Sequence, residues 1–159
     1  MGYLKHALVI GVGATLVMDT WGIVRRPLLG LPRLDYGLLG RWFGHMVDGR
    51  FRHQAIAAAE PIPRERLIGW TMHYLIGVSF AVLLLGTTGP EWLDRPTLGP
   101  ALLIGMGTSA APLLVMQPAM GGTGSPRANV ARLQSLVTHT VYGLGLYLAG
   151  WADHLLLRP

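Results

Sequence analysis

Four stretches of about twenty residues, almost free of charged side chains, constrain this chain more than any other feature. They cover residues 4–24, 67–85, 98–117 and 133–151. Each is long enough to cross the roughly 30 Å hydrocarbon core of a bilayer as an α-helix. Inside lipid, a backbone satisfies its own hydrogen bonds only as a helix or a closed barrel. The sequence therefore predicts an all-α, integral membrane four-helix bundle, and Pro112 predicts a kink in the third span.

The composition of the chain agrees with a membrane protein. Only 13% of the 159 residues are charged, 51% are hydrophobic and 22 are glycine, and glycine is more frequent in membrane helices than in soluble ones. The chain contains no cysteine, which excludes thiolate ligands and a cysteine nucleophile. The net charge of +5 comes without a nucleic-acid-binding module, so nucleic acid is excluded as a partner. The expected partners are the lipid bilayer and anionic lipid head groups.

The longest connection, residues 31–63, lies between the first two spans. We expect it to form an interfacial helical hairpin, with its second helix over residues 51–59. In its first helix an apolar face should rest on lipid or on the bundle. That face contains Leu38, Trp42 and Met46, while Arg41 and Asp48 are expected to face water.

Basic residues set the expected orientation. Ten of the thirteen Lys and Arg residues lie within residues 25–66 and 127–132, and three lie on the other side. The positive-inside rule then places the 31–63 segment in the cytoplasm and both termini outside it. We therefore expect one multi-pass domain, residues 1–159, in a bacterial inner membrane.

Three ionisable residues share one depth in the predicted bundle. Asp19, His73 and His139 lie six or seven residues from the cytoplasmic ends of three different spans, on faces that also contain small residues. Small residues face neighbouring helices, and an ionisable residue inside a membrane is a candidate for function. A single histidine of this kind also commonly serves only as a hydrogen-bonding link between helices.

The cytoplasmic segment adds further polar candidates to this end of the bundle. The predicted metal ligands are His45, His53, Glu60, Asp19, His73 and His139. Imidazole and carboxylate ligands without thiolate suit Zn, Fe, Mn or Cu, and the same cluster could relay protons, since histidine titrates near neutral pH. For an anionic head group or another small ligand, the candidates are Arg41, Arg50 and Gln117.

Motifs along almost the whole chain resemble a bacterial family of small four-span membrane proteins classed only as a domain of unknown function. The motifs are ATLVMDTWG, LDYGLLGRWFGHM, RFRHQAI, GWTMHYLIG, PTLGPALLIG, MQPAMG and RLQSLVTHTVYGLGLYL. The resemblance implies the fold and the number of spans, and no activity.

Two functions fit the sequence. The first is a polytopic inner-membrane protein whose cytoplasm-facing His/Asp site binds a metal ion or a small amphipathic substrate. The alternative is a non-catalytic accessory subunit or assembly factor, with other membrane subunits or a second copy as partners. No residue is predicted to be catalytic.

Overall fold

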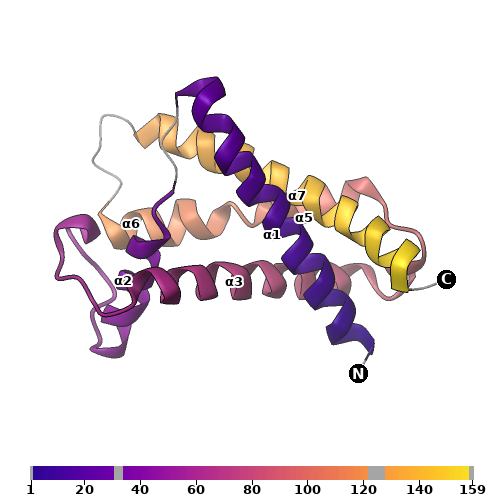
Figure 1. Cartoon of the computed structure of the whole chain (residues 1–159), viewed down its shortest axis with the longest axis horizontal. Helices are drawn as coiled ribbons and strands as arrows, with labels where there is room; N and C mark the ends of the chain where they lie inside the picture. Colours follow the sequence, from indigo (N-terminus) through magenta and orange to yellow (C-terminus); the bar gives the residue numbers. More distant parts are fainter. Residues whose placement is uncertain (1, 31–33, 122–127, 158–159) are drawn as a thin grey trace. The chain divides into compact units, whose positions relative to one another are not determined.

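The computed structural model describes residues 2–30, 34–121 and 128–157, and Figure 1 shows that these residues form helices and short connections. No strand occurs in these described ranges, so the all-α prediction is confirmed. The long helices are α1 (Gly2–Leu29), α3 (Glu65–Thr88) and α7 (Ala128–Leu157). A fourth helical run consists of α5 (Leu98–Gly107), the π-helical η2 (Ala111–Met116) and α6 (Gln117–Met120). The short elements are α2 (Tyr36–Val47), the 3-10 turn η1 (Ile56–Ala58) and α4 (Glu91–Asp94).

Among the described residues, three helical runs are long and apolar enough to cross a membrane: Gly2–Leu29, Glu65–Thr88 and Leu98–Met120. The predicted fourth span lies in α7, which is not one of these three although it is 30 residues long. Its polar residues, such as Gln134 and His139, lower the mean hydropathy of this stretch.

The described residues form two compact units. The first consists of the described parts of Met1–Arg33, Tyr74–Ser109 and Leu136–Pro159. Its helices approach one another at small residues. A Cβ added at Gly143 of α7 would lie 2.9 Å from the carbonyl oxygen of Ala101, and one at Gly145 would lie 2.9 Å from the Cα of Ala14. Such close backbone contacts are typical of membrane helix pairs.

The second unit consists of the described parts of Leu34–His73 and Ala110–Ser135. In this unit α2 lies across the first turns of α3 (Figure 1), and a Cβ added at Gly40 would lie 2.6 Å from the backbone nitrogen of Gly69. The core of the unit contains the buried side chains of Leu39, Trp42 and Ile56, with partly buried methionines packed around them.

Two of the helical runs in the described residues contain a proline. Helix α1 continues through Pro27 to Leu29 and stops at Gly30, which has a φ of +65° and whose N–H donates to the Arg26 carbonyl oxygen at 3.0 Å. The run formed by α5, η2 and α6 leaves regular α-helical geometry near Pro112, with a turn at 108–109 followed by η2. Proline has no N–H to donate to the carbonyl four residues earlier, which explains the interruption.

The predicted second helix of the hairpin is wrong. Within residues 51–59 the structure has an extended segment and only the short turn η1. The backbone of the extended segment bonds outside itself: the Trp42 Nε1–H donates to the Phe51 carbonyl oxygen at 2.9 Å, and the His53 N–H donates to the Ala119 carbonyl oxygen at 2.7 Å. These tertiary bonds replace helical ones. Residues 31–33 of the predicted segment lie outside the described residues.

The prediction for the exposed face of α2 is wrong at one residue. Asp48 is exposed and Trp42 is buried, as expected, but Arg41 is buried. Its burial follows from its ion pair with Glu65 and from the backbone carbonyls of η1 that pack against it.

Candidate functional site

Two histidines predicted as ligands meet in the second unit. His45 lies on the buried face of α2, with 1% of its surface exposed, and His53 lies in the extended segment that follows. His45 Nδ1 and His53 Nε2 are 2.8 Å apart, and the two rings are stacked with centroids 4.9 Å apart. The turn at Gly49 makes this contact, because it reverses the chain and returns it along α2.

The hydrogen bonds around this pair assign its protons. His45 Nε2 lies 3.1 Å from the carbonyl oxygen of Glu60, and a carbonyl only accepts, so Nε2 carries the hydrogen. In neutral His45, Nδ1 is then an acceptor, and the His53 Nε2–H donates to it. The remaining His53 nitrogen, Nδ1, is therefore a bare lone pair, and it is buried without a hydrogen-bond partner among the described residues.

The surroundings of His53 disfavour its charged form. Burial lowers the pKa of its imidazole below the usual range, and the positive charge of Arg50 lowers it further. Burial disfavours a charged imidazole, and nearby positive groups add to that effect. A neutral imidazole retains a lone pair, which is the form that binds a metal ion.

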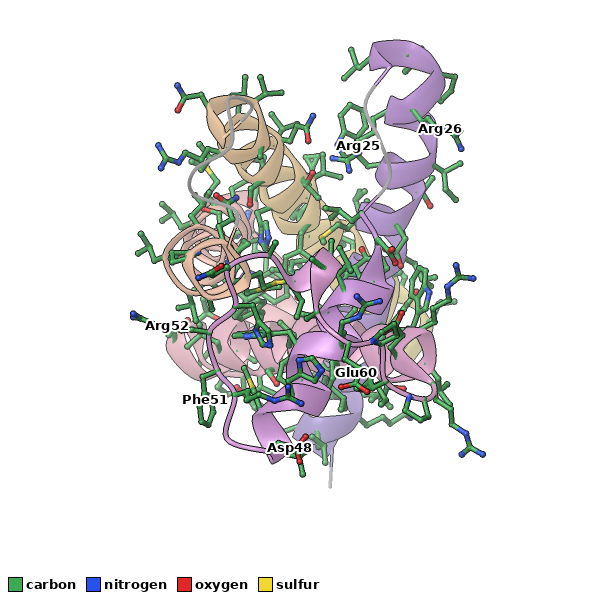
Figure 2. All side chains as sticks on the ribbon, turned by 90° about the vertical axis from the view of Figure 1, so that its left-hand side faces the viewer. Arg25, Arg26, Asp48, Phe51, Arg52 and Glu60 are labelled. Carbon is green, nitrogen blue, oxygen red and sulfur yellow. The ribbon has the colours of Figure 1, made fainter. Side chains whose placement is uncertain are left out.

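Glu60 contributes to the site through its backbone. Its carbonyl oxygen accepts the hydrogen bond from His45, while its side chain is exposed (Figure 2). In the described parts of the chain, no group of three or more His, Cys, Asp or Glu residues is placed to hold a metal ion. The site that the described residues show is therefore a pair of imidazoles whose backbone neighbour is Glu60.

Arg41 fixes the segment that supplies Glu60. Its Nε donates to Glu65 Oε2 at 2.8 Å and its Nη2 donates to Glu65 Oε1 at 3.0 Å. Its Nη1 donates to three backbone carbonyls at 2.9–3.2 Å, those of Ile56, Ala57 and Ala59. The structure therefore shows a role for Arg41 in holding η1 against α2 and α3.

The other predicted ligand-binding residues differ in exposure. The Arg50 side chain is 53% exposed and pairs with Asp48 at 3.5 Å, while Gln117 is half-buried at the start of α6. Binding of a head group by Arg41, Arg50 or Gln117 stays a prediction.

Asp19 and His139 lie in the first unit, each in a contact between two helices. The Tyr74 hydroxyl of α3 donates to Asp19 Oδ2 of α1 at 3.0 Å. His139 Nδ1 lies 2.9 Å from Thr108 Oγ1. Because the Thr108 hydroxyl donates to the Gly105 carbonyl at 2.6 Å, the hydroxyl oxygen accepts from His139.

His73 belongs to the second unit. It is buried, and its ring stacks on Tyr36 of α2 with centroids 4.2 Å apart. Trp70 packs against both of these rings. A site shared by Asp19, His73 and His139 stays a prediction, since His73 lies in a different unit from the other two.

Sequence reasoning misses two buried polar contacts in the first unit. His6 Nδ1 lies 2.7 Å from Asp153 Oδ2, and the Asp153 side chain is fully buried. Arg25 is buried, and its Nη1 donates to Thr138 Oγ1 at 3.2 Å. The partners are more than a hundred positions apart in the chain, so no local spacing signals either contact.

The chain belongs to the family described as "Protein of unknown function (DUF2938)", whose model matches residues 8–153. No curated protein and no solved structure matches it significantly. The matched range contains both histidines of the pair, as well as Arg41 and Glu65. The family description names no activity.

Proposed function

We propose that this protein is a membrane protein that binds a divalent transition-metal ion at the His45–His53 pair. The observation that supports this is the approach of two imidazole nitrogens to 2.8 Å, with the other nitrogen of His45 held by a backbone carbonyl. Histidine ligands of metals commonly donate their second N–H to a carbonyl or a carboxylate, which fixes the tautomer and the ring orientation. His45 already has that arrangement.

The spacing of the pair is close to what a metal ion requires. Two nitrogens bound at about 2.0–2.1 Å in tetrahedral geometry lie roughly 3.3 Å apart. An opening of about 0.5 Å from the observed 2.8 Å would place an ion between them. His53 would then change tautomer, its hydrogen moving from Nε2 to Nδ1, and no net proton would be lost.

Oxygen ligands would complete the coordination. The exposed Glu60 carboxylate starts from the residue whose carbonyl already contacts His45, and water would fill the remaining positions. Two imidazoles with oxygen ligands suit Zn or Cu better than Mn, which prefers carboxylate and water. A site with only two fixed protein ligands would hold its ion in exchangeable form.

The proposal includes the membrane topology predicted from the sequence. Helix α7 would be the fourth span of a bacterial inner-membrane protein, with both termini outside the cytoplasm. At 30 residues and 1.5 Å per residue it is long enough, and its exposed side chains include Leu133, Leu144 and Leu148. The histidine pair would then receive its ion from the cytoplasm.

Zn²⁺ titration of the purified protein in mild detergent, followed by calorimetry, tests the metal proposal. We expect stoichiometric binding, weakened more than about tenfold in His45→Ala and in His53→Ala. Zn²⁺ at a hundred times its Kd should also stabilise the fold by about 2.7 kcal/mol, and in both variants the same concentration should stabilise it by no more than about 1.4 kcal/mol. His154→Ala is the matched control. His154 and its hydrogen-bond partner, the Leu93 carbonyl, both belong to the first unit, whereas the histidine pair belongs to the second.

The same titration separates the two candidate metal sites. Unchanged Zn²⁺ affinity in both variants of the pair would exclude the proposal. Loss of binding in His73→Ala and His139→Ala alone would instead locate the ion at the three-helix site predicted from the sequence.

A further inference from the structure

The turn formed by residues 47–52 presents an unusual surface to solvent. Val47 is 88% exposed and Phe51 is 58% exposed, although both are apolar. Arg50 and Arg52 are exposed on either side of Phe51, and Figure 2 shows Phe51 and Arg52 at the outer edge of their unit, pointing away from its ribbon. This surface, here called the 47–52 turn, combines apolar and positively charged side chains.

The 47–52 turn is held in one conformation. Helix α2 ends at Val47, Gly49 in the turn that follows has a φ of +74°, and two backbone bonds of 2.9 Å close the turn. The Arg50 N–H donates to the His45 carbonyl, and the Gly49 N–H donates to the Met46 carbonyl. This is the Schellman motif, which glycine favours because it adopts positive φ without strain. The surface is therefore preorganised.

The packing of α2 on α3 fixes the level of the turn. The two helices are in backbone contact at Gly40 and Gly69. Gly69 lies four residues after the first residue of α3, or about 6 Å along the helix. Because α3 is apolar enough to span a membrane, this contact lies where the chain would enter the bilayer. Helix α2 runs across α3 (Figure 1), so its C-terminal turn stays close to the same level.

We infer that the 47–52 turn binds the surface of a bilayer containing anionic lipids. Phe51 and Val47 would enter the head-group region, while Arg50 and Arg52 would contact lipid phosphates. Aromatic and basic side chains are favoured at this interface, for apolar burial and for charge respectively. Asp48 pairs with Arg50 at 3.5 Å and offsets part of its charge, so Arg52 supplies more of the attraction. This inference is independent of the metal site.

The absence of cysteine from the chain allows a direct test. A spin label is attached at Val47→Cys, and a second protein carries the label at Ala58→Cys, an exposed control site in η1. Each full-length protein is placed in nanodiscs of phosphatidylcholine, with or without phosphatidylglycerol, in the presence of EDTA. At position 47 we expect high accessibility to oxygen and low accessibility to a water-soluble nickel complex when anionic lipid is present. At position 58 we expect low accessibility to oxygen and high accessibility to the nickel complex.

Removing the positive charges of the turn identifies the residues responsible. In the Val47→Cys background, Arg50→Gln with Arg52→Gln should weaken the lipid-dependent protection, by about fivefold for each arginine removed. Arg64→Gln with Arg66→Gln is the control, because both residues are exposed and basic but lie outside the turn. An equal effect of the two pairs would overturn the inference, as would nickel accessibility at position 47 that does not depend on lipid charge. Dipolar broadening between two labels at position 47 would show that a second copy covers the turn and would also overturn it.

Discussion

At the scale of single residues, Arg41 has the largest structural effect that the contacts indicate. Its guanidinium joins three separate segments, α2, η1 and α3, through two bonds to Glu65 and three to backbone carbonyls. Arginine suits this position because its planar group offers five donors in a fixed geometry. The segment carrying Glu60 is held toward His45 by this arrangement, so Arg41 positions the candidate metal site without being part of it.

We predict that Arg41→Ala lowers the free energy of unfolding by about 3 kcal/mol or more, because it leaves Glu65 without its partner in a partly buried position. Arg41→Lys should recover only part of the loss, since an ammonium group cannot form the paired bonds. Thermal unfolding in mild detergent measures both. Arg50→Ala is the control: its exposed pair with Asp48 should contribute less than about 0.5 kcal/mol. A similar small loss in Arg41→Ala would show that the buried network contributes little.

At the scale of elements, glycine positions decide which helices touch. The contact between α5 and α7 forms where Gly105 and Gly143 face each other, next to the bond between Thr108 and His139. Small residues of α1 differ in their surroundings: Gly11 and Thr15 are buried, whereas a Cβ at Gly22 would meet nothing within 4 Å. A small residue therefore marks a possible contact, and the partner helix decides whether the contact forms.

We predict that Gly143→Val separates α5 from α7 and costs about 1–3 kcal/mol, the usual range for an overpacked site. The added side chain would overlap Leu102 and the Ala101 carbonyl oxygen, since even a Cβ would lie 2.9 Å from that oxygen. Gly86→Val is the matched control, because a Cβ there meets nothing within 4 Å. Comparing the unfolding of the two variants in detergent tests this, and equal stability would mean that the contact at Gly143 is loose.

At the scale of the whole molecule, membrane topology is the main prediction. Three helical runs are apolar enough to span, and three spans would place the termini on opposite sides. Four spans, with α7 included, would place both termini on the same side. The distribution of basic residues, ten on one side and three on the other, agrees with the four-span arrangement under the positive-inside rule.

Cysteines at Asn129 and Leu156, both exposed and near opposite ends of α7, should therefore react from opposite sides of the membrane. In intact cells an impermeant maleimide should label Leu156→Cys and leave Asn129→Cys unmodified. Arg50→Cys should be protected and Asp94→Cys labelled, which fixes the orientation of the other connections. Labelling of both α7 sites from one side would exclude α7 as a span.

Much of the helical structure follows from the sequence because it depends on local properties. Apolar stretches of sufficient length, the break at Pro112 and the turn at Gly49 after α2 are each set by neighbouring residues. The prediction for residues 51–59 is wrong because their backbone bonds to Trp42 and Ala119, which lie outside the segment. The single membrane domain expected from the sequence stays a prediction, and the described residues form two compact units.

The amino-acid sequence by itself determines that this protein is helical, that it has segments able to enter a membrane, and which polar residues lie within those segments. Hydropathy and backbone hydrogen bonding decide these properties over twenty residues or fewer. Only the tertiary structure decides which polar groups meet. His45 reaches His53 after a chain reversal, Arg41 reaches Glu65 across 24 positions, and His6 reaches Asp153 across 147. Such pairings depend on how helices pack, and the packing is set by close contacts between residues far apart in the chain.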